Sequence, residues 1–140
     1  MLIKKIGLKN FRNHQSLSFD FSDHLNVITG NNAVGKTNIV EAIYYLSLAR
    51  SFRTNEDEDL IKKNQDRAEI DAVLVEGEIT RKIKIVITRG GKVVMINGKN
   101  IAKLSELSKC VNVILFQPKD VLLFSGPPKD RRNFLDISIS

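Results

Sequence analysis

The segment 30–37, which reads GNNAVGKT, constrains what this chain can fold into more than any other feature. It matches the pattern G-x-x-x-x-G-K-[ST] at every fixed position, and loops with this pattern turn successive backbone N–H groups toward phosphate. In such a loop Lys36 faces the β- and γ-phosphates, and the hydroxyl of Thr37 suits Mg²⁺. The candidate nucleotide-binding residues are therefore Gly30, Asn31, Asn32, Ala33, Val34, Gly35, Lys36 and Thr37.

The sequence on both sides of this loop has the character that a phosphate-binding loop requires. The short apolar run 24–29 ends at Gly30 and predicts a central strand that leads into the loop. Apolar residues then recur every three or four positions from 39 to 49, which predicts a helix over 36–49 that is buried on most of its sides. Three further apolar residues widen this stripe: Val40, Tyr44 and Leu48.

The rest of the chain is rich in strand patterns. Apolar and polar residues alternate with a period of two, or nearly so, over 2–11, 16–21, 69–75, 82–88 and 93–96. The dipeptide Asn97-Gly98 favours a two-residue hairpin because both turn positions need positive φ, so we expect an antiparallel section over 69–101. We expect a short helix near 104–109 and a further buried strand over 111–116.

Composition limits the class of protein. A chain of 140 residues is about the size of one domain, and no apolar run approaches the ~18 residues of a membrane span. The N-terminus lacks the apolar region of a signal peptide, and a lone cysteine, Cys110, fits a reducing compartment, so we expect a cytoplasmic protein. The net charge of +6 permits nucleic-acid binding without establishing it.

Binding a nucleotide does not imply hydrolysing it. Hydrolysis also needs a carboxylate at the end of an apolar strand, which holds Mg²⁺ and the attacking water. The nearest matches are Glu76 and Asp120, and neither follows a strand of the expected kind. We therefore predict that residues 1–140 alone do not hydrolyse ATP, and that Glu41, Asp120 and Asp136 are the carboxylates to substitute first if they do.

Three blocks of sequence together resemble a known family. They are LKNFRNH at 8–14, GNNAVGKTNIVEAIYYLSLARSFRT at 30–54 and FQPKDVLLFSGPPKDRRNFLD at 116–136. They occur in the order of the RecF family, bacterial recombination and gap-repair ATPases related to SMC and ABC-type ATPase heads. The resemblance covers nearly all of the chain. It implies an α/β fold of the P-loop NTPase class, the N-terminal lobe of an ABC-type head, with a mixed sheet around the helix of the phosphate loop.

The resemblance also implies roles for particular residues. Arg12 resembles the arginine that reaches the nucleotide in this superfamily, and Gln117 falls where relatives place a glutamine that contacts Mg²⁺ and the attacking water. His14 stands where we expect an aromatic residue, so no catalytic role is assigned to it. Residues 1–125 would form the ATPase lobe, and 126–140 would begin a helical lobe.

The family further implies an activity and partners. Its members are weak DNA-dependent ATPases of DNA replication, gap repair and the SOS response, and ATP binding drives their dimerisation on DNA. DNA junctions between single and double strands, a RecR-type protein and a second copy of the chain are the implied partners. The signature motif and the catalytic acid would lie beyond Ser140, so we interpret the sequence as the N-terminal part of a chain more than twice as long.

Other functions remain open at this stage. A small-molecule kinase would need an acceptor site and an arginine-rich lid, and the antiparallel section over 69–101 argues against it. An SMC-like head would need a long heptad coiled coil, which 129–140 are too few to show. A binding module without activity is a further alternative. DNA-contacting residues cannot be assigned, although four basic residues could meet phosphates: Lys119, Lys129, Arg131 and Arg132.

Overall fold

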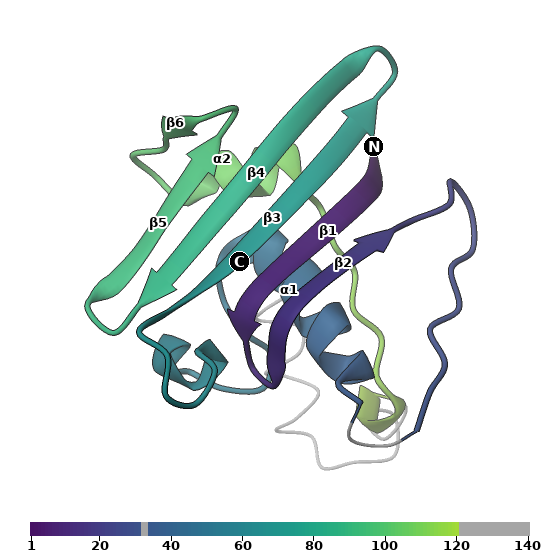
Figure 1. Ribbon diagram of the computed structural model, residues 1–140. Coiled ribbons are helices and arrows are strands. Elements are labelled where there is room, and N and C mark those ends of the chain that lie inside the picture. The colour runs from purple at the N-terminus through teal and green to yellow at the C-terminus, as the bar shows by residue number, and fades with distance from the viewer. Residues whose placement is uncertain (32–33, 121–140) are drawn as a thin grey trace, which may run out of the picture.

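The structure is a computed structural model, and it describes residues 1–31 and 34–120. Within these residues six strands form one sheet in the order β2-β1-β3-β4-β5-β6, and every ladder is antiparallel (Figure 1). The elements in chain order are β1 (Leu2–Phe11), β2 (His14–Asp20), α1 (Lys36–Leu48), the 3₁₀ turn η1 (Asp57–Leu60), β3 (Arg67–Glu76), β4 (Ile79–Thr88), β5 (Gly91–Ile96), β6 (Lys99–Asn100) and α2 (Ser105–Cys110).

The register of the central strands explains why one face of the sheet is buried. Leu8 of β1 pairs with Ile70 of β3, and Ile70 pairs with Ile85 of β4. These three side chains are almost completely buried and form one row across the sheet. Successive side chains of a strand point to opposite faces, so the period-two pattern of the sequence places the apolar set on a single face.

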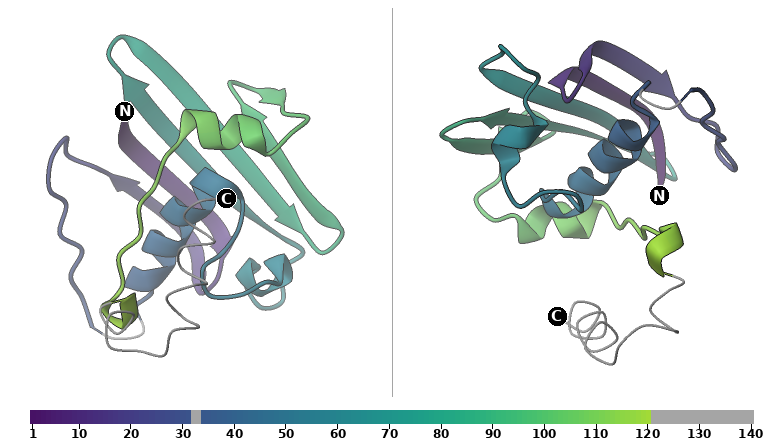
Figure 2. Two further views of the ribbon diagram at one scale, coloured as in Figure 1. Left: turned by 180° about the vertical axis from the view of Figure 1, so that it is seen from behind. Right: turned by 90° about the horizontal axis from the view of Figure 1, so that it is seen from below.

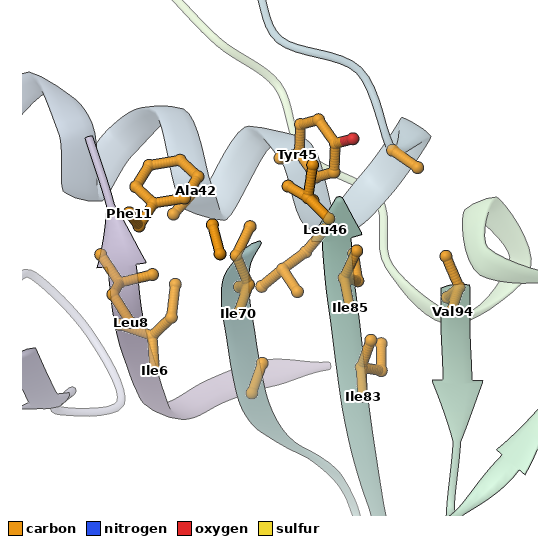
Figure 3. Close-up of a cluster of buried hydrophobic side chains, with 14 of the residues drawn as sticks. Ile6, Leu8, Phe11, Ala42, Tyr45, Leu46, Ile70, Ile83, Ile85 and Val94 are labelled. Carbon is orange, nitrogen blue, oxygen red and sulfur yellow. The ribbon is translucent and has the colours of Figure 1, made fainter. Parts of the chain in front are cut away.

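The two helices lie on that buried face, and the opposite face is open (Figure 2). Ala42, Tyr45 and Leu46 of α1 point toward the sheet, where they meet Phe11 and Ile70 (Figure 3). Leu107 of α2 and Val111 just after it complete the same core. The helix predicted from the apolar spacing at 36–49 is therefore confirmed, as is the short helix near 104–109.

The hairpin predicted at Asn97-Gly98 is also confirmed. The φ angles of these two residues are 50° and 79°, and Ile96 pairs with Lys99 directly across the turn. Asn and Gly tolerate positive φ better than other residues, so the turn fits the twist of the strands that it joins.

Two predicted strands do not form. Residues 24–29 and 111–116 form no regular secondary structure and belong to no ladder in the described part of the chain. Several of their apolar side chains lie in solvent, since Val27 is 72% exposed and Ile114 is 92% exposed, although Val111 is buried. A strand needs a neighbour for its backbone N–H and C=O groups. The sheet is consequently antiparallel throughout the described residues, not mixed as expected.

Most of α1 is buried as expected, with seven of its thirteen residues buried, but the three residues expected to widen the buried stripe are not all covered. Val40 and Leu48 are 37% and 46% exposed, and with the half-buried Tyr44 they form an apolar stripe on the side of α1 away from the sheet. The helical lobe expected to begin at 126 lies outside the described residues. Within the part that is described, no helix is long and apolar enough to cross a membrane.

Candidate phosphate-binding site

The phosphate loop ends in a tight left-handed turn at Gly35. Its φ and ψ angles are 88° and 24°, a conformation that side chains disfavour, and α1 begins at the next residue, Lys36. The N–H of Asn38 donates to the Gly35 carbonyl at 3.0 Å and closes the first turn of the helix. Among residues 1–31 and 34–120 no side chain caps this helix, and its first turn contains no acidic residue. The positive end of α1 is therefore open to an anion.

The other described candidate residues of the loop lie close to the start of α1. The ammonium group of Lys36 donates to the Gly30 carbonyl, so the lysine folds back over the loop. Val34 donates its N–H to the Asn31 carbonyl at 3.4 Å, and the side chain of Thr37 is exposed at the first turn of α1. Asn32 and Ala33 lie outside the described residues.

Arg12 is held by other parts of the chain beside the start of α1. Its Nε and Nη2 atoms donate to the two carboxylate oxygens of Glu41 at 2.9 and 2.7 Å, and Nη1 donates to the Asp59 carbonyl at 2.9 Å. The backbone of Arg12 is left-handed, with φ of 53°, and its N–H donates to the Leu60 carbonyl at 2.7 Å. All three guanidinium nitrogens thus have protein partners in this state.

Glu41 is the centre of this polar network, and its side chain is completely buried. Besides Arg12 it accepts hydrogen bonds from Ser51 at 2.5 Å and from Arg53 at 3.1 Å. Burial alone would raise the pKa of the Glu41 carboxyl, but the hydrogen bonds from Arg12 and Ser51 and the two guanidinium charges outweigh it. The pKa of Glu41 is therefore lowered, and the group is a buried anion with its oxygens engaged.

Sequence reasoning named Glu41 only as a carboxylate to substitute if hydrolysis occurred. The signal for its structural role is a charged residue inside an apolar helical stripe, where an unpaired carboxylate would be costly. Such a position implies a cationic partner without saying which. Arg12 and Arg53 lie 29 and 12 positions away, and only the fold brings them together.

The turn between β1 and β2 reaches the phosphate loop directly. The Nε2 atom of His14 lies 3.2 Å from the Gly35 carbonyl oxygen. The Oδ1 atom of Asn13 accepts a hydrogen bond from Nδ2 of Asn38 at 2.6 Å, and Oδ1 of Asn38 accepts one from Arg53 at 2.8 Å. No sequence pattern signalled these contacts.

A second polar cluster fixes the loop after α1 against the sheet. Asp57 accepts hydrogen bonds from Tyr45 at 2.8 Å and from the Lys92 ammonium at 2.7 Å, and Lys92 also donates to the Ala49 carbonyl at 2.6 Å. Burial, together with the hydrogen bond and the charge of Asp57, raises the pKa of Tyr45. These contacts hold the segment that carries Ser51 and Arg53 beside Glu41.

Gln117 is not joined to this site in the described residues. Its backbone N–H donates to the Asp120 carboxylate at 2.6 Å, and the Asp120 N–H donates to the Gln117 carbonyl at 2.9 Å. Asp120 therefore caps a turn at the end of the segment 111–117. The Mg²⁺ and water contacts predicted for Gln117 remain predictions.

Comparisons with known proteins identify the family of this chain. The model of the RecF/RecN/SMC N-terminal domain matches residues 2–126. A curated relative from Clostridium acetobutylicum, called DNA replication and repair protein RecF, is 45% identical over all of this chain and 39% of its own length. A solved structure of the recombination mediator protein RecF, designated RecF-ATPrS, is 31% identical with a TM-score of 0.88, and the match covers 99% of this chain and 38% of that one.

A third similarity is to a structure from work on ATP-driven dimerisation and DNA-stimulated activation of SMC ATPases. It is 25% identical with a TM-score of 0.78, and the match covers 99% of both chains. The chain thus spans about two fifths of the length of the curated relatives that it matches, and nearly the full length of this SMC-type neighbour.

Proposed function

This chain belongs to the RecF/RecN/SMC N-terminal domain family, and on that premise we propose that it is the ATP-binding part of a RecF-type protein of DNA replication and repair. In this proposal it acts in the cytoplasm as an ATP-dependent DNA-binding protein. The identity to RecF relatives exceeds the identity to the SMC-type structure, 45% against 25%, which favours RecF over an SMC head.

The observation that carries the proposal is the open start of α1 behind a left-handed Gly35. Phosphate oxygens would accept from the backbone N–H groups of the loop and of the first turn, and the helix end adds partial positive charge. Lys36 would exchange its Gly30 partner for the β- and γ-phosphates. The nearby network of Arg12, Glu41 and Arg53 carries a net charge of +1, which also favours an anion.

Mg²⁺ belongs to the same proposal. The exposed hydroxyl of Thr37, one residue after Lys36, fits the role of a metal ligand beside a bound triphosphate. When bound, the ion would supply positive charge that offsets the charge of the phosphates. Gln117 is the second proposed ligand, and it would have to approach the loop, because in the described residues its backbone contacts are to Asp120.

The proposal also includes dimerisation, DNA binding and partner proteins. ATP would favour a homodimer if the second copy contacts the γ-phosphate, because a ligand shifts an equilibrium by its different affinity for the two states. The SMC-type neighbour comes from work on ATP-driven dimerisation, and the RecF structures come from the RecFOR pathway. By this likeness we propose DNA junctions and a RecR-type protein as partners.

Substitution of Lys36 tests the proposal in the full-length protein. Lys36→Ala removes the charge at the β- and γ-phosphates, and each charge-assisted hydrogen bond lost costs about 1.5–3 kcal/mol, or roughly 10- to 150-fold in affinity. Titration with a fluorescent ATP analogue and Mg²⁺ measures the affinity. Sedimentation of the same proteins with ATP, with ADP and without nucleotide shows whether ATP-dependent dimerisation is lost as well.

The control is Lys99→Ala, which removes an exposed lysine from β6 at the far edge of the sheet. We expect this variant to bind the analogue as the wild type does. Equal affinity in wild type and Lys36→Ala would remove Lys36 from the site. A protein that stays monomeric under all three conditions would refute the dimer part of the proposal alone.

A further inference from the structure

The turn between β1 and β2 packs directly against Gly35 of the phosphate loop. A Cβ atom added to Gly35 would lie 2.4 Å from Nε2 of His14 and 2.7 Å from Oδ1 of Asn13. Both distances are far below ordinary van der Waals contact. A side chain at position 35 would therefore strain the backbone at its positive φ and displace the side chains of His14 and Asn13.

The His14 contact has a defined donor. The carbonyl oxygen of Gly35 can only accept, so Nε2 of His14 carries the proton and donates. The same oxygen accepts the N–H of Asn38, so two donors fix the peptide that ends the loop and begins α1. Asn13 accepts from the Asn38 side chain and thus holds the first turn of α1 from the same side.

The turn is itself anchored firmly. Arg12 donates its N–H to the Leu60 carbonyl, and the ammonium group of Lys62 donates to the Asn13 carbonyl at 3.0 Å. On its other side the turn continues into β1, the strand between β2 and β3, through the fully buried Phe11. Its position is therefore set by the antiparallel sheet and not by the phosphate loop.

From these contacts we propose that Asn13 and His14 are positioning residues for phosphate binding. They hold the Gly35 peptide and the first turn of α1 in the left-handed, open geometry from the side of the sheet. The backbone N–H groups then meet a triphosphate without first having to be ordered, so less of the binding energy is lost. The inference rests on the proposed nucleotide binding for its effect on affinity, but the order of the empty loop can be measured without nucleotide.

The test compares two substitutions at His14 in the full-length protein. His14→Phe keeps a flat ring but removes the donor, whereas His14→Gln keeps an N–H donor at a similar reach. The matched control is His24→Gln, which changes the other histidine of the chain, an exposed one in segment 22–30. Two quantities are measured: amide hydrogen exchange at residues 34–38 without nucleotide, and the affinity for a fluorescent ATP analogue with Mg²⁺.

We expect His14→Phe to speed amide exchange at 34–38 and to weaken binding of the analogue by about 2- to 10-fold, the effect of one hydrogen bond. His14→Gln should restore both quantities to within about 2-fold of the wild type, and His24→Gln should change neither. The thermal midpoint should be similar in all four proteins, because the contact lies outside the core.

Two results would overturn the inference. One is exchange and affinity in His14→Phe that match the wild type. The other is an equal loss in His14→Phe and His14→Gln with an equal fall in thermal midpoint, which would mean a general structural role. If the wild type itself binds no analogue, the proposed function fails, and the exchange measurement still decides whether His14 orders the loop.

Discussion

Helix α1 separates two regions that are built in different ways. On one side is the antiparallel sheet, whose apolar residues find partners within the described chain. On the other side are the phosphate loop, the segments 22–30 and 111–117, and the exposed stripe of Val40 and Leu48. Both regions contain apolar residues in strand-like or helical patterns, but the first buries most of them, whereas in the second Val27 and Ile114 lie in solvent.

The difference shows what an apolar pattern requires before it becomes structure. Ile85 and Ile114 are the same residue type in similar strand patterns, and they are 0% and 92% exposed. Ile85 lies on a strand with neighbours on both sides, whereas the segment of Ile114 has no ladder partner in the described residues. The polar network around Glu41 lies where the two regions meet.

The largest expected effect comes from breaking the polar network around Glu41, which is the junction between the two regions. Glu41→Ala leaves the guanidinium groups of Arg12 and Arg53 without their buried counter-ion, and breaking a buried ion pair costs about 3–5 kcal/mol. Denaturant unfolding of the 140-residue chain measures this loss. Because Glu41 contacts the β1–β2 turn and the loop after α1, we expect both regions to lose stability.

The control for Glu41 is Glu58→Ala in η1, where the exposed side chain makes no ion pair in the described residues. A surface change of this kind is expected to stay within about 0.5 kcal/mol of the wild type. A Glu41→Ala variant as stable as Glu58→Ala would show that the network does not join the two regions.

The next effect compares the regions directly. Ile85→Ala should destabilise the 140-residue chain by about 2–5 kcal/mol, because it removes buried methyl groups and leaves a cavity. Ile114→Ala should change the free energy of unfolding by less than about 0.5 kcal/mol, because its side chain already lies in solvent. Denaturant titration of both variants is the measurement.

The comparison of Ile85 and Ile114 fails if the two substitutions cost the same in this chain. The comparison is more informative when the same two substitutions are also made in a protein of the relatives' full length. If Ile114→Ala costs more there than in residues 1–140, the segment 111–117 has a packing partner outside the described residues.

Much of the fold could be predicted because its signals are local. The period of two in β3 and β4, the helical spacing in α1 and the Asn97-Gly98 turn each depend on residues close in sequence. The strands expected at 24–29 and 111–116 were wrong for a physical reason. Periodicity describes which side chains are apolar, but a strand also needs a neighbour, which sequence spacing does not reveal.

The candidate site likewise has features that local sequence predicts and contacts that only the fold reveals. The loop pattern identified Gly35 and Lys36 at once, because phosphate binding uses consecutive backbone groups. The contacts of His14 with Gly35 and of Arg12 with Glu41 join residues 21 and 29 positions apart, and they depend on how the β1–β2 turn packs against α1. The sequence analysis did not use the one available signal for Glu41, a charged residue inside an apolar helix, and only the fold supplies its partners Arg12 and Arg53.

The smallest expected effect lies on the open face of the sheet, far from the junction. Lys84 donates to Glu69 at 2.7 Å, and this hydrogen bond lowers the pKa of Glu69 against the opposing effect of burial. A lowered carboxylate pKa contributes stability above the unfolded value of about 4.3, and this contribution is lost as the pH falls through the folded value.

Lys84→Met should therefore cost at most about 1 kcal/mol near pH 7, since Lys84 is partly exposed, and the cost should shrink below about pH 4. Lys82→Met, two residues earlier on the same face and without an ion pair in the described residues, should show no such pH dependence. The free energy of unfolding of both variants is measured between about pH 3 and pH 7, roughly the range over which carboxylates titrate. A cost for Lys84→Met that is constant across that range would contradict the pairing of Lys84 with Glu69.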